Sequence, residues 1–198
     1  MNPALAVDAA VIFVCLCWAG FLIPFVSSRD RRRAATERRA PASYLGIALQ
    51  GASFAIIWCF TTNGLRAYAF DMPRSLVYGL CVVATALAAV SLWMAVAAIR
   101  ALGKQWSFQA RIIEGHRLVV EGPYSHVRHP IYTAMLGMLL ATGVTVSVWW
   151  ALSAAVALFS AGTAIRVRAE ERLLHEAFGE DFEAYRRYVP AVIPRWKT

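Results

Sequence analysis

The chain alternates between long apolar runs and shorter polar segments. Five runs contain no Asp, Glu, Lys or Arg, and they cover Ala9–Val26, Tyr44–Phe60, Ser75–Ile99, Ile131–Val148 and Trp149–Ile165. A helix needs roughly 20 apolar residues to cross a bilayer, so each run is close to membrane-spanning length. The pattern predicts an all-α membrane protein with about five transmembrane helices.

The fourth and fifth runs have almost nothing between them. Only the stretch T-V-S-V and two tryptophans are available to form the turn. We expect these two runs to form a tight helical hairpin that enters from the cytoplasmic side. Its depth is left open, because the hairpin could cross the bilayer fully or dip into it.

The tail that begins at Arg166 has a helical pattern. Apolar residues recur at three- and four-residue spacing, at Leu174, Phe178, Phe182 and Tyr185. This spacing predicts one apolar helix face. Gly179 predicts a helix end with a restart, and Val189-Pro190 predicts the final stop. We therefore expect a C-terminal cytosolic helix.

Composition supports a single integral membrane domain over residues 1–198. Hydrophobic residues make up 59% of the 198 residues, and charged residues only 16%. A soluble domain would carry about 25% charged residues. We expect three spans within residues 1–100 and the functional half in residues 101–198. The net charge of +8 lies beside the apolar runs rather than on a polar domain, which argues against nucleic-acid binding.

Basic residues predict the orientation of the chain. Residues 27–39 hold six arginines against one Asp and one Glu, and Arg100 and Lys104 follow the third run. Cytoplasmic loops are enriched in Lys and Arg, so the N-terminus is expected outside and the C-terminus in the cytoplasm. The first run lacks signal-peptide features. The Ala- and Arg-rich composition favours a bacterial inner membrane, where the basic loop can contact membrane lipids.

The sequence gives little support for a metal site. All four cysteines lie inside apolar runs, without C-x-x-C pairing or a neighbouring histidine. His126 and His129 are three residues apart, but no acidic residue follows at a fitting distance. We predict that no metal is bound.

One polar segment between the third and fourth runs is the main candidate for chemistry. The stretch from Gly115 to Tyr132 holds three of the four histidines, together with arginines, prolines and tyrosines. Polar groups close to lipid are costly and usually functional. Arg166 and Glu170, four residues apart at the end of the fifth run, share a helix face. We expect the histidine segment and this pair to meet in one water-accessible cavity.

Nucleotide binding of the soluble type is excluded by the glycine spacing. No two glycines are one residue apart, so the chain has no G-x-G turn, and no βαβ pattern is present. A Rossmann-type cofactor site is therefore not expected.

Several motifs in the C-terminal half resemble a known family. The sequence G-P-Y-S-H-V-R-H-P-I-Y is followed, about forty residues on, by R-V-R-A-E-E, F-G-E-D-F-E-A-Y and V-P-A-V-I-P. From Gln109 to Pro194 the chain resembles the isoprenylcysteine carboxyl methyltransferase family. Two positions depart from the family pattern, where Ala134 replaces a common glycine and Phe182 replaces a common tyrosine.

The resemblance implies a membrane enzyme that binds S-adenosylmethionine without a Rossmann domain. By position, it assigns Arg166 to the substrate carboxylate and Glu170 to the reaction site. It assigns the cofactor contacts to Gln109, His116, Leu118, Val119, Tyr124, His129, Tyr132 and Glu170. The implied substrate is a lipophilic, prenylcysteine-like molecule with a carboxylate.

Three functions remain open from the sequence. Methylation of a carboxylate needs no general base, because a free carboxyl with a pKa of ~3.5 is already ionised. Methylation of an amine headgroup, as in phospholipid methyltransferases, would need His126 or His129 as a base. A non-catalytic membrane scaffold is the third possibility, and it predicts no affinity for the cofactor.

Overall fold

The computed structural model describes residues 2–27, 38–39, 42–61, 65, 72–106, 111–112 and 117–194. In these ranges the chain forms the α-helices α1 (Pro3–Ser27), α2 (Ala42–Cys59), α4 (Arg74–Leu102), α5 (Pro130–Val146), α6 (Trp149–Phe178) and α7 (Glu180–Tyr188). A short antiparallel ladder pairs β1 (Arg38–Arg39) with β2 (Arg111–Ile112). The prediction of an all-α membrane protein is confirmed, with this ladder as a small addition.

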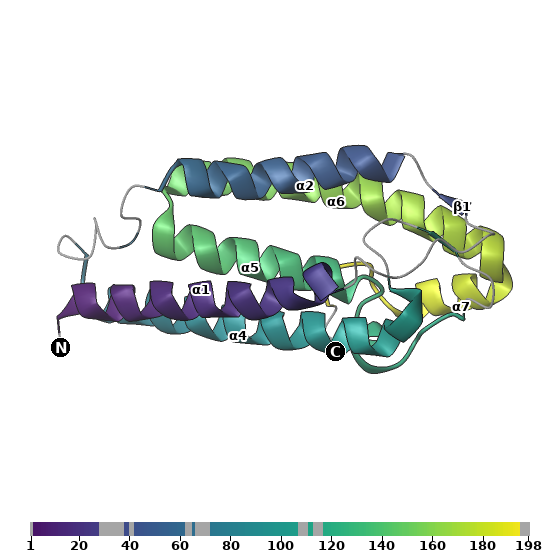
Figure 1. The fold of residues 1–198 in the computed structure, drawn as a ribbon, viewed down its shortest axis with the longest axis horizontal. Coiled ribbons are helices and arrows are strands. Elements are labelled where there is room, and N and C mark those ends of the chain that lie inside the picture. Colours follow the sequence, from purple (N-terminus) through teal and green to yellow (C-terminus); the bar gives the residue numbers. More distant parts are fainter. Residues whose placement is uncertain are drawn as a thin grey trace.

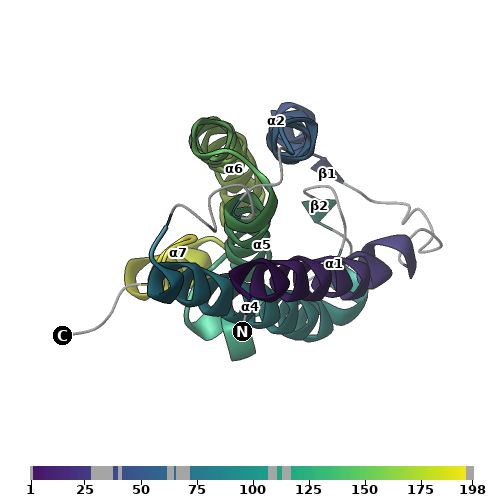
Figure 2. The same cartoon turned by 90° about the vertical axis from the view of Figure 1, so that its left-hand side faces the viewer.

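The five long helices lie side by side along the long axis of the molecule (Figure 1). α2 packs along α6, α4 along α5, and α1 along α4. Viewed from the end, α5 lies between the α2–α6 pair and the α1–α4 pair (Figure 2). α7 and the β1–β2 ladder lie at one end of the bundle, which we call the site end (Figure 1).

Among the described residues, three helices are long and apolar enough to cross a membrane, within Pro3–Ile23, Arg74–Leu102 and Trp149–Phe178. The apolar helices Ser43–Cys59 and Pro130–Val146 are shorter. The turn after α5 nevertheless reaches the end of α2, because Thr61 and Ser147 form a backbone bridge. The α5–α6 hairpin therefore extends along α2 to the end opposite the site. The chain is an integral membrane protein, and its orientation stays a prediction.

Packing of the α1, α4 and α5 helices relies on small residues. Ala88 and Ala95 of α4 and Ala134 and Ala141 of α5 are buried in one cluster with residues of α1. On α5, a Cβ added to Gly137 would lie 2.1 Å from the Ser91 hydroxyl oxygen of α4. Small side chains let helix backbones approach closely where lipid supplies no hydrophobic driving force between helices. The alanine at position 134 therefore fits a tight contact.

Two local features position the site end. α5 begins at Pro130, where the missing N–H costs no helical hydrogen bond. α6 continues without a break from the apolar run into the tail and ends at Phe178. Gly179 has φ +50°, a conformation that favours glycine, and α7 starts directly after it. The predicted break at Gly179 and stop at Val189-Pro190 are confirmed.

Candidate active site at one end of the bundle

The last turns of the α6 apolar region face the segment that precedes α5. The Tyr132 hydroxyl donates a hydrogen bond to Glu170 Oε1. His129 Nδ1 lies 3.3 Å from Glu170 Oε2, and His129 Nε2 lies 3.2 Å from Glu171 Oε1. One buried imidazole therefore bridges the two adjacent carboxylates. The expected contact between the histidine segment and Glu170 is present through His129, while the shared water-accessible cavity stays a prediction.

The C-terminal segment holds this histidine from the other side. The backbone N–H of Arg128 donates to the Pro190 carbonyl at 2.8 Å, and the backbone N–H of His129 donates to the Ala191 carbonyl at 2.9 Å. The Thr133 hydroxyl donates to the Val192 carbonyl at 2.6 Å. These bonds satisfy backbone groups at the start of α5, where no helical partner exists. The V-P-A-V-I-P motif therefore acts as a backbone support for His129.

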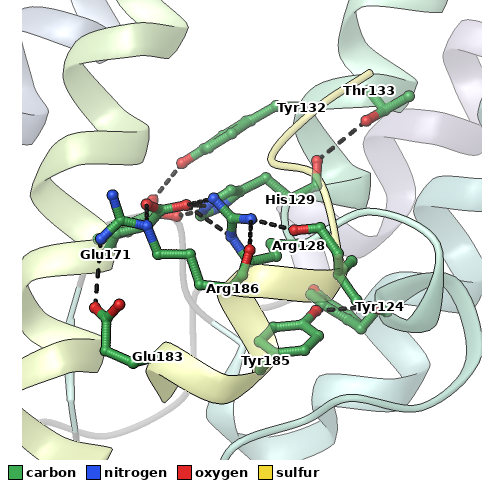
Figure 3. Close-up of polar contacts among 11 residues, drawn as sticks. Tyr124, Arg128, His129, Tyr132, Thr133, Glu171, Glu183, Tyr185 and Arg186 are labelled. Atoms are coloured by element: carbon green, nitrogen blue, oxygen red, sulfur yellow. Dashed lines mark hydrogen bonds and ion pairs between the residues drawn. The ribbon is translucent and has the colours of Figure 1, made fainter. Parts of the chain in front are cut away.

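Arg128, which lies just before α5, contacts residues of both α6 and α7 (Figure 3). Its Nη2 and Nε lie 2.6 Å and 2.9 Å from Glu171 Oε1. Its Nη1 donates to the carbonyls of Arg186 and Val189. The Arg186 Nε also lies 3.8 Å from Glu171 Oε2. Charge-assisted contacts of this kind are stronger than neutral hydrogen bonds, so they fix the orientation of Glu171.

Arg166 is a buried cation with contacts from two helices. Its Nη1 donates to Gln50 Oε1 on α2 at 3.0 Å, and its Nη2 lies 3.7 Å from Glu170 Oε1. Its guanidinium carbon lies 4.9 Å from the centre of the Tyr132 ring. The Tyr132 ring in turn stacks on His129 with 5.6 Å between centroids. Arg166 and Glu170 share a face of α6, as the sequence predicted.

The other predicted cofactor contacts lie around a second, less polar wall. Val119 and Tyr124 are buried and pack with Ala98 of α4, while Leu118 is half-buried. The Tyr185 hydroxyl of α7 donates to the Tyr124 carbonyl at 2.6 Å. Gln109 and His116 lie outside the described residues.

The pKa values of the site follow from burial and charge. Burial lowers the pKa of His129, but its hydrogen bonds and charge contacts with Glu170 and Glu171 outweigh this effect and raise it overall. Burial raises the pKa of Tyr124, and it raises that of Tyr185 to about 12. Both phenols therefore stay neutral at physiological pH, and the neutral Tyr185 hydroxyl is able to donate its hydrogen bond to the Tyr124 carbonyl.

Glu170 is the most accessible member of the central cluster. Its side chain is 23% exposed, against 6% for Arg166 and for His129. A bound molecule can therefore reach the carboxylate while the cations behind it stay shielded from water. Within the described ranges, no three His, Cys, Asp or Glu side chains group in a way that could hold a metal ion.

Residues 80–181 match the family model described as phospholipid methyltransferase. The chain belongs to this family. The matched part includes α5 and the whole of α6, so it contains His129, Tyr132, Arg166, Glu170 and Glu171. α2, which carries Gln50, lies outside the match.

The chain is also similar to the cobalt-zinc-cadmium resistance protein CzcN of Cupriavidus metallidurans. The two are 37% identical over 111 residues, which is 54% of this chain and 49% of that protein. The match thus spans about half the length of each. Members of this family are membrane methyltransferases that use S-adenosylmethionine, in agreement with the broader part of the sequence prediction.

Sequence reasoning found the centre of the site and missed its supports. Glu171 and Arg128 stand in the quoted motifs but were not predicted as site residues. Gln50 was missed although it left a signal, since it is a polar residue inside the apolar run Tyr44–Phe60. His126, a candidate base, is exposed and its Nδ1 lies 2.9 Å from the Ser125 hydroxyl.

Proposed function

We propose that this protein transfers a methyl group from S-adenosylmethionine to the carboxylate of a lipophilic, prenylcysteine-like substrate at the membrane interface. The main support is the convergence of His129, Tyr132, Arg166 and Glu170 at one end of an apolar bundle. This cluster places a buried cation beside an accessible carboxylate. The two groups suit an anionic acceptor and a cationic cofactor respectively.

The residues present fit the cofactor by their chemistry. S-adenosylmethionine supplies a methyl group on a sulfonium and carries an ammonium and a carboxylate. The accessible Glu170 carboxylate suits the ammonium as a charge-assisted partner. Leu118, Val119 and Tyr124 offer the apolar wall that a purine ring needs. The contacts assigned by resemblance to Gln109 and His116 stay predictions.

The choice of a carboxylate acceptor rests on Arg166. A guanidinium that is 5% exposed attracts an anion more strongly than one in water. An ammonium headgroup would meet repulsion there. Methyl transfer would require the site to hold the acceptor in line with the methyl group, because such positioning contributes a large share of a transfer reaction's rate.

His129 is poorly suited to the base that amine methylation needs. Its contacts with Glu170 and Glu171 raise its pKa, so the imidazole gives up its proton less readily than a free histidine does and is less available to accept one. A carboxylate acceptor is already ionised and needs no base. Methylation of an amine headgroup is the alternative function, and the description of the matched family favours it. In that case the exposed His126 is the remaining histidine candidate among the described residues.

Calorimetry with S-adenosylhomocysteine tests the cofactor site. We expect micromolar binding to wild type in lipid nanodiscs. The variant Glu170→Ala should bind at least about 100-fold more weakly, because a buried cation cluster loses its carboxylate and the ammonium loses its partner. Glu176→Ala, on an exposed position of the same helix, is the matched control. Full-strength binding by Glu170→Ala would contradict the assignment, and no binding by wild type would favour a non-catalytic scaffold.

The acceptor is tested by product chemistry. Purified enzyme with a radiolabelled methyl donor is offered S-farnesylcysteine and phosphatidylethanolamine in parallel. A methyl ester releases volatile methanol in alkali, whereas a methylated amine does not. Alkali-labile label on the acid supports the proposal. Label found only in alkali-stable lipid headgroups would establish the amine alternative.

A further inference from the structure

Gln50 connects α2 to the proposed acceptor site. The side chain is 2% exposed in the middle of an apolar helix. Its Oε1 accepts from Arg166 Nη1 at 3.0 Å, and its Nε2 donates to Thr163 Oγ1 at 2.8 Å. Both partners belong to α6. The amide therefore satisfies both of its polar ends on the helix that carries the site, which fits a specific role better than a chance contact.

Two glycines make this connection possible. A Cβ added to Gly46 would lie 2.4 Å from Arg166 Cγ and 2.7 Å from the Gly162 carbonyl oxygen. A Cβ added to Gly162 would lie 2.8 Å from the Gly46 carbonyl oxygen. The backbones of α2 and α6 are therefore nearly in contact here, and the two helices lie side by side in Figure 1. This approach lets Gln50 reach Arg166, and it confines the Arg166 side chain.

The partner of Arg166 on α2 is neutral, and this matters for its charge. A guanidinium buried in a membrane protein needs a hydrogen-bond partner. A carboxylate at this position would satisfy the bond but add a full negative charge. The Gln50 amide satisfies it without that charge, and the carboxylate of Glu170, on α6, lies at the longer distance of 3.7 Å. The contact from α2 therefore adds no negative charge beside the Arg166 guanidinium.

We propose that Gln50 is a positioning residue that sets specificity for a carboxylate acceptor. It orients the Arg166 guanidinium without adding a negative charge that would repel the substrate carboxylate. This inference rests on the proposed function, in which Arg166 binds the acceptor carboxylate. It also assigns a part of substrate selection to a helix outside the residues that match the family.

The test compares Gln50→Glu with Gln50→Leu in nanodiscs. Gln50→Glu keeps the hydrogen bond to Arg166 but adds a negative charge. We expect it to raise the KM for S-farnesylcysteine about tenfold or more, and to weaken calorimetric binding of that acid without cofactor to the same degree. Gln50→Leu removes the atom that accepts the hydrogen bond from Arg166. It should also raise the KM for S-farnesylcysteine, and the fall in kcat should be smaller than the rise in KM. Binding of S-adenosylhomocysteine should be unchanged in both variants.

Ser53→Ala is the matched control. Ser53 is fully buried on the same helix, but its hydroxyl donates to the Gln50 carbonyl within α2, so its loss should leave the acid KM unchanged. Thermal unfolding of all variants separates folding from specificity. Gln50 variants that lower Tm but leave the acid KM and acid binding at wild-type values would overturn the inference. Failure of the proposed function shows separately, as alkali-stable products from wild type.

Discussion

The two halves of the bundle are held together in different ways. Where α1 meets α4 and α5, most buried residues are apolar, with Val14, Cys17 and Phe21 among them, and the buried polar groups include the hydroxyls of Ser91 and Thr142. Where α2 and α5 meet the site end of α6, the buried residues include an imidazole, an amide and a guanidinium. We call these the apolar half and the polar half. Buried polar groups are costly in a membrane unless they are paired, so we expect the polar half to carry the function and the apolar half to serve as the scaffold.

The largest loss of stability is expected from a substitution of Glu171, in the polar half. Glu171→Ala removes the partner of Arg128 and His129, whose side chains are 9% and 6% exposed, and should destabilise the protein by about 3–5 kcal/mol. Thermal unfolding in detergent measures this effect. The exposed pair of His175 with Glu183 is the control, since His175→Gln should cost less than about 1 kcal/mol. Equal losses of stability in the two variants would mean that the contacts of His129 and Arg128 with Glu171 do not stabilise the fold.

The second test concerns the contact between α2 and α6. Gly46→Ala places a methyl group 2.7 Å from a backbone oxygen, and we expect a cost of about 1–3 kcal/mol with a loss of methyl transfer. A Cβ at Gly51 on the same helix meets nothing within 4 Å, so Gly51→Ala should be neutral or stabilising. An active, fully stable Gly46→Ala protein would contradict the close contact.

The third test uses pH. The raised pKa of His129 means that the folded protein binds the proton more tightly than the unfolded chain. The resulting stability is fully present below the unfolded value of about 6.5 and is lost as the pH rises through the higher folded value. The Tm advantage of wild type over His129→Gln should therefore shrink with increasing pH. An advantage that grows with pH would show that His129 is neutral in the folded state.

The smallest effect is expected in the apolar half. Trp18 Nε1 donates to Thr142 Oγ1 at 2.9 Å, between α1 and α5. Trp18→Phe removes this bond and should cost about 0.6 kcal/mol, with methyl transfer unchanged. A large loss of activity from this change would remove the distinction between scaffold and functional halves.

The sequence predicted features that depend on local pattern. The apolar runs, the break at Gly179 and the shared face of Arg166 and Glu170 all follow from periodicity or from the freedom of glycine. The motif resemblance pointed to His129 and Tyr132. It also pointed to a narrower family than the matched one, because the motifs lie in the half that we predict to bind the cofactor and carry little information about the acceptor.

The contacts that support the site depend on which face each helix presents to its neighbours. His129 meets Glu171 across 42 residues, and Gln50 meets Arg166 across 116. No periodicity within one helix fixes such a contact. Gln50 was still detectable as a polar residue in an apolar run, but its partner was not. The backbone bonds from Pro190 and Ala191 had no sequence signal beyond the resemblance of the motif.

The carbonyls of Pro190, Ala191 and Val192 hold the start of α5, and this has a consequence for biosynthesis. A truncated protein that ends within α7 already contains every apolar helix described above and can insert into the bilayer. It lacks the C-terminal backbone segment whose carbonyls hold His129 and the start of α5 in place. We therefore expect membrane insertion and correct placement of His129 to be separate events, and nonsense mutations within α7 should yield inserted protein that lacks methyl transfer.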